Sequence, residues 1–155
     1  MKLIIGSDHA GYELKQRLIR ELTAAGQAVE DFGTSTEESC DYPDIGLKVA
    51  EQVARDADTL GILICGTGIG MSITANKVPG IRAALAYNTY SAQYAREHNN
   101  ANILVLPGRV FGKEMSMDMI RAWLHARFAG ERHQRRLDKI SDVEKKYLRS
   151  VKEPA

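Results

Sequence analysis

The chain has 155 residues, of which 44% are hydrophobic and 26% charged, a composition typical of one compact globular domain. Its 21 basic and 20 acidic side chains nearly cancel, so no long-range field favours nucleic acid or an anionic membrane surface, and any anion site must be local. No apolar run approaches the roughly 20 residues of a membrane span, and the run before Gly6 is too short for a signal peptide. We therefore expect a soluble, cytoplasmic protein that binds neither nucleic acid nor membrane, with both cysteines reduced.

Strand-like and helical patterns alternate along the chain. A short apolar run over 2–6 predicts a strand, and leucines spaced three or four apart predict a helix over 10–26. A strand over 27–33, a helix over 41–56 and a wholly apolar strand over 60–65 follow. Helical segments at 70–76 and 89–98 then separate strands at 80–87 and 101–108. After Pro107 the pattern is helical to the end, with a break at Gly130 and a charged final helix.

Apolar strands separated by helices predict a parallel sheet that is covered on both faces. The expected fold is α/β: a single Rossmann-like three-layer domain with a five-stranded parallel sheet and a C-terminal helical extension. We expect the domain to span 1–149, its final helix at about 133–149 to pack on a partner subunit, and 150–155 to be a frayed tail.

Ligands in such a sheet bind beyond the carboxyl ends of the strands. The candidate segments are therefore "SDHAG" after the first strand, "CGTGIG" after the third, and the loops after the fourth and fifth. Three familiar glycine-loop motifs do not fit "CGTGIG". A P-loop needs Lys before Ser72, a dinucleotide fingerprint has a different glycine spacing, and a cysteine phosphatase needs arginine where Met71 stands.

The remaining pattern is a thiol at a strand end, followed by backbone amides that lead into a helix. Glycines let those amides turn inward to stabilise an oxyanion, and the same positive field favours a thiolate at Cys65. Cys65 is then a usable base or nucleophile. The alternative is a buried structural cysteine beside a tight turn, since free cysteine is among the most buried residue types.

Further candidate site residues lie elsewhere in the chain, and some of them also have a purely structural explanation. Asp8 and His9 follow the first strand, at the same sheet edge as Cys65. His98 ends a helix at "HNN", where it could simply accompany a left-handed asparagine cap. Arg132 and Arg136 are four apart and face the same way, as a phosphate clamp would require, although a basic helix is more often a solvated face.

Six segments together give the chain a resemblance to a known family. They are "GSDHAG", "DYPD", "CGTGIGMSITANK", "GIRAAL", "YSAQYAREHNNANIL" and "GERHQRRLDKI". Nearly end to end, the chain resembles the sugar-phosphate isomerase family of ribose-5-phosphate isomerase B, which also contains galactose-6-phosphate isomerase subunits. The resemblance implies aldose–ketose interconversion through an enediolate, without a metal or cofactor. It also implies a homodimer whose phosphate clamp is completed in trans, and leaves open a dimer of dimers.

The resemblance also assigns residue roles. Cys65 would move the proton between C1 and C2, with Thr67 assisting, and Asp8 and His98 would open the sugar ring. The remaining substrate contacts would come from His9, Gly66, Gly68, Ile69, Gly70, Asn99, Arg109, Arg132 and Arg136, with Asp8 and Thr67 also in contact. A subgroup of the family carries glycine at the cysteine position and glutamate at the position of Met71, so this chain matches the thiol-base subgroup.

The residues by themselves agree with that chemistry. Isomerisation needs a base and donors aimed at charge that develops only during reaction, which a thiol and fixed amides supply. Two alternatives remain: an isomerase of another sugar phosphate, such as an allose, galactose or tetrose phosphate, and a non-catalytic sugar-phosphate binding module. A binding module would have no need of Cys65 or His98.

Overall fold

The computed structural model describes the backbone of residues 2–150 and the side chains as far as residue 147. Five parallel strands form one sheet in the order β2-β1-β3-β5-β4. Their bounds are β1 Lys2–Ser7, β2 Val29–Asp31, β3 Thr59–Cys65, β4 Ala83–Leu85 and β5 Ile103–Pro107. The central strands β1, β3 and β5 are almost wholly buried, as their apolar sequences require.

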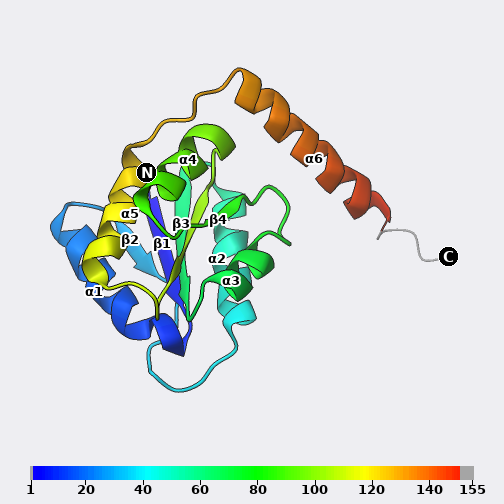
Figure 1. Cartoon of the computed structure of the whole chain (residues 1–155). Coiled ribbons are helices and arrows are strands. Elements are labelled where there is room, and N and C mark those ends of the chain that lie inside the picture. Colours follow the sequence, from blue (N-terminus) through cyan, green and yellow to red (C-terminus); the bar gives the residue numbers. More distant parts are fainter. Residues whose placement is uncertain (1, 151–155) are drawn as a thin grey trace.

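Helices cover both faces of the sheet (Figure 1). They are α1 Tyr12–Ala24, α2 Tyr42–Arg55, α3 Ile69–Ala75, α4 Thr89–Asn99, α5 Lys113–His125 and α6 Arg132–Ser150, with a short 3-10 turn, η1, at His9–Gly11. One apolar cluster joins the sheet to α1, α4 and α5, and a second joins it to α2 and α3. The three-layer α/β fold with a five-stranded parallel sheet is therefore confirmed.

Local sequence explains where the helices begin and end. Helix α1 buries Leu14, Leu18 and Leu22, the stripe that its periodicity predicted, and ends before Gly26, whose φ is +81°. A capping box between Asn88 and Ser91 starts α4. The observed strands β2 and β4 are shorter than the sequence predicted, because only three residues of each pair with a neighbour.

Helix α6 extends away from the rest of the domain (Figure 1). Leu137 and His133 are buried near its start, whereas Ile140 and Val143 farther along are more than half exposed. The side chain of Glu144 accepts a hydrogen bond of 3.0 Å from the Gly80 N–H and so ties the helix to the loop before β4. The tail predicted at 150–155 begins at the last residue of α6, and 151–155 lie outside the described residues.

No helix among the described residues is long and apolar enough to cross a membrane.

Candidate active site

The carboxyl edge of the sheet brings the loops after β1, β3 and β5 together. Cys65 is the last residue of β3, is 4% exposed and pairs in register with Pro107 of β5. Its carbonyl accepts a hydrogen bond from the Gly108 N–H at 2.8 Å, and the Gly66 carbonyl accepts one from the Arg109 N–H at 3.1 Å. The backbone that carries the thiol is therefore held by hydrogen bonds to the loop after β5.

The glycine loop after Cys65 turns sharply into α3. Gly68 has φ +80°, a conformation that favours glycine, and a Cβ there would lie 2.4 Å from Leu85 Cδ1. A Cβ at Gly70 would lie 2.5 Å from Tyr42 Cζ, so the Tyr42 ring covers the first turn of α3. Since α3 has only seven residues, the amides of the loop and first turn supply most of the positive field at this edge.

Thr67 and Ile69 lie on the exposed side of this loop. The Thr67 hydroxyl accepts a hydrogen bond of 3.4 Å from the Ile69 N–H, a local turn just before α3. The side chain of Arg109 runs beside Gly66, with Cδ and Nη1 3.7 and 3.9 Å from the place of a Cβ there. An arginine and several amides thus line the same edge as the thiol, an arrangement suited to an anionic ligand.

Asp8 is fixed at the end of β1. It is 5% exposed, its carboxylate accepts a hydrogen bond from the Gly11 N–H at 3.1 Å, and its own N–H donates to the Ile64 carbonyl at 3.3 Å. A carboxylate is thereby held one strand away from the thiol, because β1 and β3 are neighbours in the sheet.

His9 is oriented by the loop at 33–41. The Cys40 N–H donates to His9 Nδ1 at 3.3 Å, which leaves the ring proton on Nε2 for another acceptor. The loop is anchored by the fully buried Lys15, whose Nζ donates to the Asp31 carboxylate and, at 2.8 Å, to the Thr34 carbonyl. The backbone of Cys40 therefore lies against a candidate site residue.

Four of the predicted site residues lie at the opposite, amino edge of the sheet: His98, Asn99, Arg132 and Arg136. Helix α4 follows β4 and returns antiparallel to it, so its last turn lies where the strands begin. The side chain of Arg82, immediately before β4, donates from Nε to the carbonyls of Asn99 and Asn100 at 3.1 and 3.0 Å. Asn100 is the left-handed cap of α4, with φ 44°.

The start of α6 completes a basic cluster at this edge. The His98 and His133 rings are stacked, with centroids 4.1 Å apart and planes 11° from parallel. His133 Nε2 accepts a hydrogen bond of 3.3 Å from Arg132 Nε. Burial, then the neighbouring charges of His98, Arg132 and Arg136, lowers the pKa of His133. Arg132 and Arg136 themselves are exposed.

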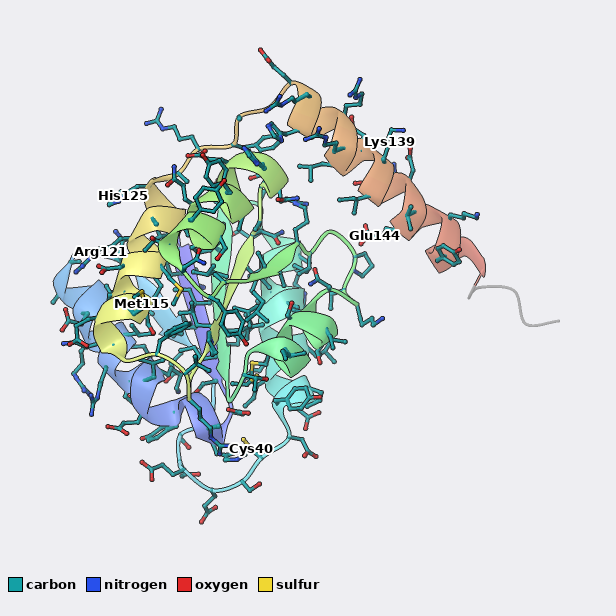
Figure 2. All side chains as sticks on the ribbon, in the orientation of Figure 1. Cys40, Met115, Arg121, His125, Lys139 and Glu144 are labelled. Atoms are coloured by element: carbon teal, nitrogen blue, oxygen red, sulfur yellow. The ribbon has the colours of Figure 1, made fainter. Side chains whose placement is uncertain are left out.

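One chain therefore does not bring all the predicted site residues together. Between the two edges runs β3, whose seven residues span about 20 Å at roughly 3.3 Å per residue. Figure 2 shows the same separation, with Cys40 at the end of the molecule opposite the start of α6. The sequence carried a signal for this: a helix that joins two parallel strands must end at the amino edge.

Two tyrosines at the carboxyl edge were missed. Tyr42 covers Gly70, and the Tyr87 hydroxyl donates to the Thr67 carbonyl at 2.9 Å. The position of Tyr87 just after β4 was the available signal, since that loop was among the candidate segments. Among residues 2–150, no three His, Cys, Asp or Glu side chains form a group able to hold a metal ion.

Residues 3–140 match the model of the family described as ribose/galactose isomerase. The chain belongs to this family. The ribose-5-phosphate isomerase B of Escherichia coli is 43% identical over 94% of this chain and 97% of its own. The D-erythrulose-4-phosphate isomerase of Pectobacterium atrosepticum is 42% identical over 93% of this chain and 95% of its own.

Solved structures of proteins named ribose-5-phosphate isomerase B have the same fold. The Clostridium thermocellum ribose-5-phosphate isomerase B matches with a TM-score of 0.92 and 55% identity, over 95% of this chain and 99% of that one. The Mycoplasma genitalium enzyme, solved with bound ribulose-5-phosphate, matches with a TM-score of 0.89 and 42% identity, over 93% of this chain and 96% of that one.

Proposed function

We propose that this chain is an aldose–ketose isomerase that interconverts ribose 5-phosphate and ribulose 5-phosphate. The observation that carries the proposal is Cys65 at the end of β3, held beside a glycine loop whose backbone can face an anion. Similarity to proteins named ribose-5-phosphate isomerase B, along almost the whole chain, supports ribose 5-phosphate as the substrate.

The reaction moves one proton from C2 to C1 and a second from the O2 hydroxyl to O1. Cys65, acting as the base, takes the proton from C2 of the open aldose and returns it to C1 of the enediolate, while the proton of the O2 hydroxyl passes to O1. The amides of 66–70, with Thr67 beside them, stabilise the enediolate oxygens, each donor contributing on the order of 3 kcal/mol as in oxyanion holes. Because only protons move, the reaction needs no redox cofactor, and in this proposal the amides take the place of a metal in stabilising the enediolate.

The active form in this proposal is a homodimer. Asp8, His9 and Arg109 stand at the carboxyl edge, whereas His98 and Asn99 stand at the amino edge. A second copy, placed with its amino edge against this carboxyl edge, would supply the ring-opening partner of Asp8 and complete the substrate contacts.

The exposed arginines of α6 would complete the phosphate clamp in the same way. Arg132 and Arg136 project from a helix that leaves the domain, and its half-exposed Ile140 and Val143 offer an apolar stripe to a partner. We treat 1–149 as one cytoplasmic isomerase domain whose last helix packs on that partner. A dimer of dimers would be the next larger assembly.

The test is a kcat/KM screen over ribose, allose, galactose and tetrose phosphates, following ketose formation. We expect the highest value for ribose 5-phosphate. A higher value for a tetrose phosphate would favour the second candidate, an isomerase like the Pectobacterium relative. If the protein binds sugar phosphates but turns over none of them, the remaining explanation is a non-catalytic sugar-phosphate binding module.

A further inference from the structure

Tyr87 connects two loops that the sheet keeps apart. It follows β4, which is separated from β3 by β5, yet its hydroxyl donates to the Thr67 carbonyl at 2.9 Å in the glycine loop after β3. Its ring packs edge-on against Phe111, with centroids 5.9 Å apart and planes at 75°. The ring is therefore held from one side while its hydroxyl reaches the loop.

The carbonyl that Tyr87 holds belongs to a peptide unit of the proposed anion site. The Thr67 C=O and the Gly68 N–H share one planar trans peptide, so they point in opposite directions. When Tyr87 fixes the carbonyl on its own side, the N–H of Gly68 is directed away from it. One side-chain hydrogen bond thus sets the direction of one amide donor.

This peptide is one that could otherwise rotate. Gly68 has φ +80°, and glycine adopts positive and negative φ about equally well, which permits the plane of the preceding peptide to flip as between turn types. A flipped Thr67–Gly68 peptide would present a carbonyl oxygen where the amide had been. A carbonyl dipole aimed at a developing negative charge opposes the reaction that the amide favours.

We propose that Tyr87 is a positioning residue that holds the Thr67–Gly68 peptide with the Gly68 N–H directed at the enediolate. This inference rests on the proposed function, because it assumes that the loop stabilises an oxyanion. In this role Tyr87 acts through the Thr67–Gly68 peptide and not on the reacting atoms themselves. Its contribution is to keep the loop in the arrangement that suits the enediolate, which forms only during the reaction.

The test is Tyr87→Phe, which removes one oxygen atom and keeps the ring against Phe111. We expect kcat to fall about fivefold, the effect of losing one ordinary hydrogen bond. Affinity for a phosphorylated hydroxamate, which mimics the enediolate, should fall by the same factor, and affinity for inorganic phosphate should not change. The matched control is Tyr90→Phe, since Tyr90 is 70% exposed and its ring lies tilted against that of Tyr94, and it should retain wild-type kcat.

A second readout does not depend on turnover. In ¹⁵N spectra of the labelled protein, Tyr87→Phe should shift the Gly68 amide and add exchange broadening there, while Tyr90→Phe should not. An unchanged Gly68 amide, or unchanged hydroxamate affinity with full turnover, would overturn the positioning role. If the wild-type protein neither turns over sugar phosphates nor binds the hydroxamate more tightly than phosphate, the proposed function is wrong. The ¹⁵N signal of the Gly68 amide in Tyr87→Phe would then still show whether Tyr87 orients the peptide.

Discussion

The two edges of the sheet hold the two halves of the proposed site in different ways. At the carboxyl edge, the thiol and the carboxylate are buried and their backbone is pinned by hydrogen bonds, as at Cys65 and Asp8. At the amino edge, the charges of Arg132 and Arg136 are exposed on the first turns of α6. Proton transfer needs fixed donors, whereas a phosphate clamp needs long cationic side chains that can reach a ligand outside their own domain.

The largest expected effect is at the buried edge. Cys65→Ser keeps nearly the same volume but replaces a thiol with a far poorer base, so kcat should fall at least ~100-fold while sugar-phosphate binding is largely kept. Steady-state kinetics and direct binding measure the two. Cys40→Ser is the matched control, because it keeps the backbone N–H to His9. Near-normal turnover of Cys65→Ser would mean that another group is the base.

The next effect tests whether the two edges act across a subunit boundary. Arg132→Ala or Arg136→Ala should raise KM tenfold or more, the equivalent of losing a charge-assisted contact of about 1.5 to 3 kcal/mol. At substrate concentrations well below KM, where Arg136→Ala chains turn over slowly, co-refolding them with Cys65→Ser chains should raise activity above that of the two separate homodimers, since one site of each heterodimer then has an intact thiol and an intact clamp. If mass spectrometry shows that heterodimers form and activity does not rise, the clamp acts within one chain.

A smaller effect should follow from disturbing His9 through its loop. Cys40→Pro removes the N–H that donates to His9 Nδ1, whereas Cys40→Ala keeps it. We expect the proline variant to raise KM about fivefold with little change in kcat, because a histidine free to change tautomer donates less reliably to phosphate. Long-range ¹⁵N spectra of the His9 ring would report the tautomer directly. Equal kinetics for the two variants would show that the loop does not orient His9.

The smallest effect concerns pH and the amino edge. The folded-state pKa of His133 is lowered, first by burial and then by neighbouring positive groups, from an unfolded value of about 6.5. Its neutral form is therefore favoured by folding. The stability that the neutral His133 ring contributes is fully present above about pH 6.5 and is lost as the pH falls through the lower folded-state pKa of His133.

Urea unfolding at pH 7.5 and 5.0, at fixed protein concentration, measures this contribution. His133→Phe keeps an aromatic ring against His98, and should lose less stability between the two pH values than wild type. Equal losses would mean that His133 is protonated as easily in the folded protein as in the unfolded chain.

Several features followed from the sequence because they depend on neighbours along the chain. Apolar runs at β1, β3 and β5 predict buried parallel strands, and the leucine spacing of α1 predicts its buried face. The glycines after Cys65 predict a turn in which backbone amides are accessible. These properties are local, so periodicity and residue type are sufficient to predict them.

Other features depended on how distant segments meet, and only the tertiary structure decided them. The strand order places β4 beyond β5, so Tyr87 reaches the Thr67 carbonyl across an intervening strand. The loop at 33–41 folds back so that the Cys40 N–H meets His9. His98 stacks on His133 at the edge opposite Cys65. No periodicity encodes these contacts, because each is set by the packing of elements far apart in the chain. The sequence by itself thus determined which groups the chain carries and at which strand ends, and the packing of helices on the sheet decided which of them share an edge.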